Sequence, residues 1–276
     1  ASTGFERTMY QVELPKNDST SLKEAFTALR DYADGNLFLP EEIEQERGVI
    51  LAETRDRDSV EYRAMKAKFA FEYPDAAEVT PLIAAAFGDM KNRAPARPEP
   101  DLGSVTPPAN VTARLHRDPE LARLMISLQT TEPYAFEPDT AANRLKYLPR
   151  QLAYAMLNRR FEELAKKPDA PFTDASAESE EFLDFSRTSS VGIVTTKPEQ
   201  WKAALAVADQ ELRRALAHGF QAAELREVTA DLANNLDEEV KQAPTRRSPA
   251  LCAELLGSIA HDNVFDLPAT RRDLFK

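Results

Sequence analysis

Two glutamates, Glu46 and Glu53, have a spacing that could place two carboxylates in one site. They enclose the run ERGVILAE at positions 46–53, and a separation of seven residues brings both to the same face of a helix. That face also carries Ile43 and Ile50. A carboxylate in an apolar stripe is costly unless it is paired, and a metal ion or a metal-bound histidine would pair it. On spacing alone, a solvated helix face is the commoner explanation.

The elements that must position these glutamates can be read from periodicity and capping signals. Residues 8–14 alternate between apolar and polar side chains, which predicts a half-buried strand. A capping-box pattern starts a predicted helix over about 21–35. Pro40, followed by two acidic residues, starts the helix of the two glutamates, which we expect over about 40–57. A third helix is expected over 58–71.

The order of these patterns resembles a known enzyme family. The sequence begins ASTGFERTMY (1–10), continues into a helix, and then reads PEEIEQERGVILAE (40–53). This order is similar to the insulinase, pitrilysin and mitochondrial processing peptidase family of zinc metallopeptidases, the inverzincins. In that family an H-x-x-E-H motif supplies two zinc-binding histidines and a general base. The run RRFEELA (159–165) resembles the bacterial single-chain members.

The resemblance implies roles for five residues. Glu53 takes the position of the family's third zinc ligand, and Glu46 that of a supporting carboxylate at the catalytic site. Ala1, Ser2 and Thr3 match an edge strand beside the zinc, with which a substrate peptide pairs by strand addition. We expect the carboxyl groups of both glutamates to point toward this strand.

The sequence departs from the family pattern in its metal ligands. It contains no H-x-x-E-H, and its three histidines, His116, His218 and His261, have no second histidine at ligand spacing. Catalytic zinc needs three protein ligands and a water molecule. We therefore expect the motif upstream of Ala1, with Zn²⁺ in the intact enzyme and no zinc bound by this chain alone.

A second departure lies near Pro74. The family places a buried strand between the third helix and a helix that would correspond to residues 76–87. The intervening residues 72–75 are too few for a strand and carry no alternating apolar pattern. We expect a break in the chain at this point.

Proline-rich residues 92–108 read as a linker between two domains. Residues 1–91 would form a partial first, catalytic-type domain and residues 109–276 a second, non-catalytic domain. The expected fold is α+β, with two related domains that each pack helices on one face of a mostly antiparallel sheet. In the second domain we expect strands at 111–116 and 124–130, a hairpin over 172–196, and helices over 140–166, 198–217, 222–241 and 249–260, with Pro149 kinking or breaking the first of these helices.

Composition excludes several classes of partner. A net charge of −11 argues against nucleic acid and anionic membranes, because both need clustered Lys and Arg. No stretch approaches the roughly 20 apolar residues of a membrane span. The single cysteine, Cys252, excludes an internal disulfide and Cys-based metal sites, and its apolar surroundings predict a small buried residue. The compartment stays open between a bacterial periplasm and cytoplasm.

Three functions remain under consideration. The first is a fragment of a zinc endopeptidase that hydrolyses peptides or unfolded segments in a closed chamber, with the remaining half of the same polypeptide or a homologous subunit as its partner. The second is a non-catalytic relative or half of such a peptidase, which binds substrate or shapes the chamber. The third, an unrelated pair of α+β binding domains, requires the two-glutamate run to be a coincidence.

Overall fold

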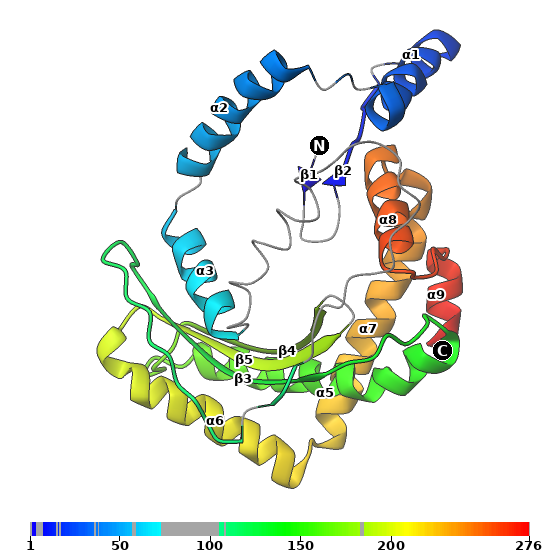
Figure 1. Ribbon diagram of the computed structural model, residues 1–276. Helices are drawn as coiled ribbons and strands as arrows, with labels where there is room; N and C mark the ends of the chain where they lie inside the picture. The colour runs from blue at the N-terminus through cyan, green and yellow to red at the C-terminus, as the bar shows by residue number, and fades with distance from the viewer. Residues whose placement is uncertain are drawn as a thin grey trace. The chain divides into compact units, whose positions relative to one another are not determined.

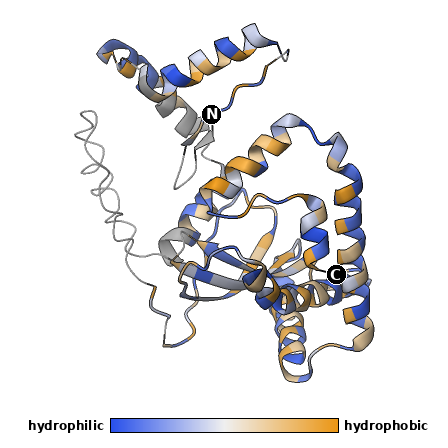
Figure 2. Cartoon of the chain, turned by 90° about the vertical axis from the view of Figure 1, so that its right-hand side faces the viewer, coloured by the Kyte–Doolittle hydropathy of each residue, from blue (hydrophilic) through white to orange (hydrophobic). Residues whose placement is uncertain are grey.

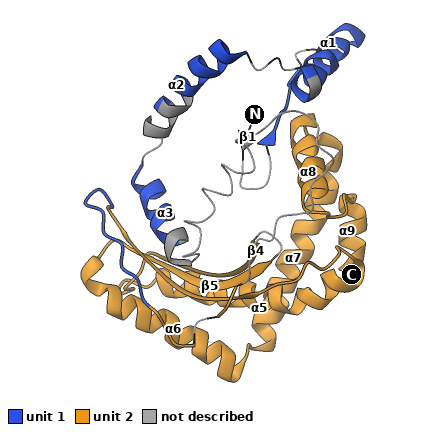
Figure 3. Ribbon diagram, in the orientation of Figure 1, with its two compact units in different colours: residues 1–99, 113–121 blue, residues 100–112, 122–276 orange. Residues whose placement is uncertain are grey.

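A computed structural model describes most of the chain and divides it into two compact units (Figure 3). Unit 1 contains residues 1–99 and 113–121, and unit 2 contains residues 100–112 and 122–276. Within them, the structure describes residues 2–3, 8–14, 16, 18–35, 37, 39–56, 59–72, 105–107, 109–182 and 185–275.

Unit 1 consists of two very short strands and three helices among its described residues. The strands pair antiparallel, with Ser2 opposite Met9 and Thr3 opposite Thr8. The elements are β1 (Ser2–Thr3), β2 (Thr8–Met9), α1 (Ser19–Arg30) with a π-helical turn at Asp31–Gly35, α2 (Pro40–Asp56) and α3 (Val60–Glu72).

Local side-chain contacts explain where the first elements of unit 1 begin and end. Helix α1 starts before the predicted capping box, because the Asp18 carboxylate accepts a hydrogen bond from the Ser21 backbone N–H at 2.9 Å. This hydrogen bond lowers the pKa of Asp18. The strand expected over 8–14 is also wrong beyond Met9, since residues 10–14 form no strand. Tyr10 instead stacks on Tyr32, with ring centroids 5.1 Å apart.

The sheet of unit 2 has three antiparallel strands in the order β3-β5-β4 (Figure 1). They are β3 (Leu124–Pro133), β4 (Asp174–Phe182) and β5 (Ser186–Thr195). Because side chains alternate across a strand, the register aligns apolar residues on one face, where Ile126 of β3 lies opposite Ile193 of β5.

Among the described residues of unit 2, five α-helices accompany the sheet, and Figure 1 labels them. They are α5 (Ala141–Ala165), α6 (Trp201–His218), α7 (Ala222–Gln242), α8 (Ser248–Ala260) and α9 (Pro268–Leu274). Coloured by hydropathy, the long helices show alternating hydrophobic and hydrophilic segments (Figure 2), as expected for helices that bury one face. Between α6 and α7 the chain turns at Gly219, whose positive φ of 68° favours glycine.

The apolar core of unit 2 lies between one face of the sheet and helices α5 and α6. Phe161 of α5 is fully buried in it, and Ile193 of β5 is 1% exposed. Small residues let the layers approach closely. The buried members of this cluster are Leu157, Phe161, Phe172, Ala175, Ala177, Val191, Ile193, Ala204 and Ala208.

Asn158 fastens α5 to the edge of the sheet. Its side-chain oxygen accepts a hydrogen bond from the Ala177 backbone N–H at 2.6 Å, and its amide nitrogen donates to the Ala177 carbonyl at 3.1 Å. The side chain therefore takes the place of a neighbouring strand at this point of β4. Such pairing satisfies backbone groups that an edge strand leaves open.

Arg160 joins α5 to the α6–α7 corner. It donates to Glu211 at 2.9 Å, to Glu224 at 2.5 and 2.8 Å, and to the Gly219 carbonyl at 3.2 Å. Its guanidinium also lies 4.6 Å from the ring centroid of Phe220. The hydrogen bond from Arg160 lowers the pKa of Glu224. Because Arg160 and Glu211 are both largely buried, loss of either partner would leave an uncompensated charge.

The α+β class with an antiparallel sheet is confirmed, as are the expected hairpin and the helices of the second domain. Three expectations for the second domain were wrong, wholly or in part. Of the kink or break expected at Pro149, the break is absent, since α5 continues through it, and the kink stays a prediction. Residues 111–116 form no strand, and Val111 is fully exposed. Cys252 is exposed.

Other expectations lie outside the described residues. They are the chain break near Pro74, the helix over 76–87 and most of the proline-rich linker. Among the residues that the structure describes, no helix is long and apolar enough to cross a membrane.

We predict that Phe161→Ala lowers the free energy of unfolding by about 3–5 kcal/mol, because it removes a fully buried ring from the core. Urea unfolding followed by circular dichroism measures the effect. Leu216→Ala on α6 is the control, because Leu216 is 78% exposed and should change stability by less than about 0.5 kcal/mol. Equal effects of the two substitutions would contradict this account of the core.

Candidate functional site

Helix α2 carries both glutamates of the candidate site. It begins at Pro40, has Glu41 and Glu42 in its first turn, and extends to Asp56. Acidic side chains in the first turn interact favourably with the positive end of the helix dipole. Glu46 and Glu53 therefore lie two turns apart on one continuous helix, so that the expected common face follows from helix geometry.

The described side chains of α2 are all exposed. They include Glu46, Ile43 at 42% and Val49 at 55%. The side chain of Glu53 lies outside the described residues. The apolar stripe that accompanies the glutamates is thus uncovered over the part of the helix that the structure describes.

A neighbouring ion pair on α2 is a surface contact. Arg47 lies 3.2 Å from Glu44, one turn before it, and both side chains are more than 60% exposed. Exposed pairs of this kind contribute little to stability. Glu44 is therefore a suitable control residue for substitutions of Glu46 and Glu53, because it is an exposed carboxylate on the same helix.

The strand that the resemblance assigns to substrate binding is β1. Ser2 and Thr3 form this strand and pair with β2, whereas Ala1 and the side chains of Ser2 and Thr3 lie outside the described residues. The direction of the glutamate carboxyl groups relative to this strand therefore stays a prediction.

Within the described part of the chain, the residues do not make up a complete zinc site. Among those that the structure describes, no three His, Cys, Asp or Glu side chains converge in a way that could hold a metal ion. His116, His218 and His261 are exposed and belong to a loop, the end of α6 and the end of α8. A catalytic zinc needs three protein ligands, and α2 offers one candidate, Glu53.

Sequence reasoning missed one polar cluster in unit 1. Arg63 of α3 donates to Asp118 at 2.7 Å and to Glu120 at 2.9 Å. The hydrogen bond from Arg63 lowers the pKa of Asp118. The cluster attaches residues 113–121 to α3 and explains why this segment belongs to unit 1. No local signal could have revealed it, because the partners are 55 residues apart in sequence.

Family models match most of the chain. The model described as insulinase (peptidase family M16) matches residues 1–71, which include α2. The model described as the peptidase M16 inactive domain matches residues 75–232, more than half of the chain.

Individual relatives agree with these matches. The chain is 36% identical over 72 residues to the probable zinc protease PqqL of Haemophilus influenzae, an alignment covering 26% of this chain and 8% of that protein. The crystal structure of the periplasmic protease PqqL from Escherichia coli is similar in fold, with a TM-score of 0.77 at 16% identity. That similarity covers 95% of this chain and 34% of the PqqL chain, so this chain spans about a third of that structure.

Two further solved structures share the fold. The first half of Escherichia coli PqqL gives a TM-score of 0.73 at 17% identity, covering 95% of this chain and 65% of that one. A predicted insulinase family protease from Yersinia pestis gives 0.52 at 17% identity, covering 72% and 42%. The expected family resemblance is confirmed by these comparisons: the chain belongs to peptidase family M16, the insulinase family.

Proposed function

We propose that this chain is part of a zinc-dependent endopeptidase that hydrolyses peptides or unfolded segments. The observation that carries the proposal is the match of residues 1–71 to the insulinase family model, since these residues contain the run ERGVILAE on α2. The partner that completes the site is the remaining part of a longer polypeptide or a homologous subunit, which would enclose the substrate in a chamber.

Each proposed site residue has a separate task. Glu53 supplies one zinc ligand, and Glu46, two turns earlier on α2, is a carboxylate that orients the site. Residues 1–3 offer backbone hydrogen bonds to an extended substrate peptide. The domain limits in this proposal are 1–91 for the partial catalytic-type domain, 92–108 for the linker and 109–276 for the non-catalytic domain.

The proposed compartment is the periplasm. The support is the solved PqqL structure, which is described as a periplasmic protease. The absence of any internal disulfide is compatible with either compartment, because the chain has one cysteine.

A second candidate function is a non-catalytic member of the family. It is favoured by the match of residues 75–232 to a domain described as inactive. Reading the sequence upstream of Ala1 distinguishes the two, since H-x-x-E-H there supports the enzyme and its absence from the whole protein supports the non-catalytic relative.

The isolated chain should not retain stoichiometric zinc, because it offers one candidate ligand where three are needed. Metal analysis of the purified chain after dialysis measures this, and we expect far less than one zinc per chain. One chelator-sensitive zinc per chain would overturn the proposed division of ligands.

In a longer protein that carries the upstream motif, Glu53→Gln should abolish zinc retention and peptidase activity together. Glu46→Gln should retain zinc and lower activity by roughly 10- to 100-fold, the usual effect of removing a group that supports metal ligands. Zinc content and peptide cleavage are measured on the same samples. Glu44→Gln is the control, because Glu44 is an exposed residue of the same helix and should change neither. Full zinc content in Glu53→Gln would exclude it as a ligand.

A further inference from the structure

The C-terminal part of unit 2 packs differently from its core. Helix α8 has no buried residue, and Pro268 is the buried residue of α9. The buried core cluster is built from residues 157–208, so neither helix contributes to it. Residues 262–275 are therefore attached by Pro268, by half-buried side chains of α9 and by a set of polar contacts.

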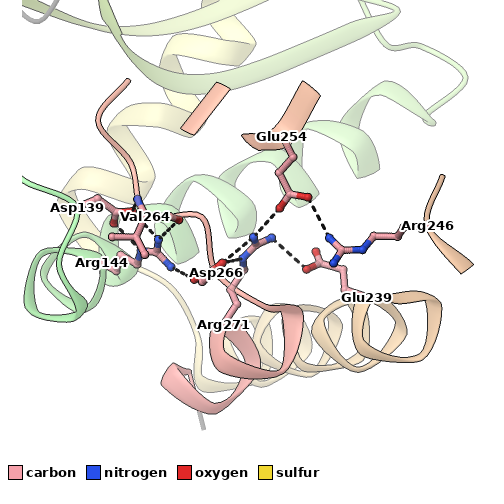
Figure 4. Close-up of polar contacts among 8 residues, drawn as sticks. All are labelled: Asp139, Arg144, Glu239, Arg246, Glu254, Val264, Asp266 and Arg271. Carbon is pink, nitrogen blue, oxygen red and sulfur yellow. Dashed lines mark hydrogen bonds and ion pairs between the residues drawn. The ribbon is translucent and has the colours of Figure 1, made fainter. Parts of the chain in front are cut away.

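Asp266 stands at the centre of those contacts (Figure 4). Its side chain is 9% exposed and accepts hydrogen bonds from Arg144 of α5 and from Arg271 of α9, the latter at 2.9 and 3.2 Å. Arg144 also donates to Asp139, just before α5, at 2.5 Å. Asp139 in turn accepts from the Val264 backbone N–H at 2.9 Å. Two separate points of the segment are thus held against the start of α5.

Arg271 extends the network to two more helices. It donates to Glu254 of α8 at 3.1 Å and to Glu239 of α7 at 3.3 Å. Glu254 also accepts from Arg246 at 3.0 Å. Figure 4 shows the resulting row of alternating charges, which consists of Asp139, Arg144, Asp266, Arg271, Glu254 and Arg246.

The electrostatic balance keeps the central carboxylates ionised. Burial acts to raise the pKa of Asp266, but hydrogen bonds from Arg144 and Arg271 outweigh it and the pKa lies below its ordinary value. The hydrogen bond from Arg144 likewise lowers the pKa of Asp139. The charged groups in contact with Asp266 are Arg144 and Arg271. The other carboxylates bound to these two arginines are Asp139, Glu254 and Glu239.

We propose that residues 262–275 form an ionic latch, which detaches from α5, α7 and α8 as one unit while the sheet and its apolar core stay folded. Local opening of this kind is expected where a segment has few buried apolar contacts. Asp266 is the residue on which the latch depends most, because it forms ion pairs with both Arg144 and Arg271. Its loss leaves both arginines without a central partner.

The direction of the pH effect follows from the lowered pKa values. A carboxyl group whose pKa is lower in the folded state contributes stability above its unfolded value, about 3.9 for Asp, and loses it as the pH falls through the folded value. The latch should therefore be closed at neutral pH, weaken progressively as the pH falls below about 4, and open fully only below the folded-state pKa values of Asp266 and Asp139. High salt should weaken it at neutral pH, because the Debye length falls to about 3 Å at 1 M.

Hydrogen exchange of the full chain at pH 7 tests the proposal. In Asp266→Asn we expect amides of residues 264–275 to exchange about 10-fold faster or more, as for loss of a charged hydrogen bond, with β5 unchanged. Asp209→Asn is the matched control, because Asp209 pairs with Arg213 on the exposed surface of α6 and should change neither segment. Equal acceleration of the latch and β5, or an unchanged latch, would overturn the proposal.

The unmutated chain provides a second measurement that does not depend on folding of the variant. Protection factors, which remove the intrinsic effect of pH and salt on exchange, are compared between pH 7 and a series of pH values descending from about 4 to about 2, and between low salt and 1 M NaCl. Selective loss of protection in residues 264–275 supports the latch. Simultaneous loss in β5, or retained protection in the latch under both conditions, contradicts it.

Discussion

The packing of one helix, α5, against the sheet organises unit 2. Within a single turn it makes three different contacts: Phe161 fills the apolar core, Asn158 bonds both backbone groups of Ala177 on β4, and Arg160 joins Glu211 and Glu224. Because these side chains project in different directions from the helix, all three contacts can form together in only one position and rotation of α5. The sheet, α6 and the start of α7 are all fixed relative to it.

Farther from α5, at helices α8 and α9, ion pairs contribute more to packing than they do in the apolar core. The apolar core holds the sheet, α5 and α6. Helices α8 and α9 lie outside that core, with Pro268 buried and several other side chains half-buried, and a row of charged residues joins them to the rest of unit 2. Apolar burial is insensitive to pH and to ion pairing, but partly buried ion pairs depend on both partners being charged. A chain assembled in this way can keep its centre folded while its periphery responds to conditions.

In the candidate site, local helix geometry fixes the relative position of the two glutamates but does not bring together the ligands of a metal ion. Helix periodicity alone puts Glu46 and Glu53 on one side of α2. A zinc centre requires convergence of ligands from several segments, and α2 provides at most one of them. The described side chains of α2 are exposed, and the chain spans about a third of the solved PqqL structure.

The sequence by itself determined the α+β class, the family and the helices of unit 2, because each depends on periodicity, caps or motifs within short windows. The tertiary structure decided what depends on distant partners. Residues 111–116 have a strand-like pattern but no pairing strand. Pro149 lacks the backbone N–H that would bond to the carbonyl of Leu145, yet α5 continues through it. Arg144 and Asp266 meet across 122 residues of sequence. No local pattern encodes such a contact, because its free energy arises only when folding brings the two charges together.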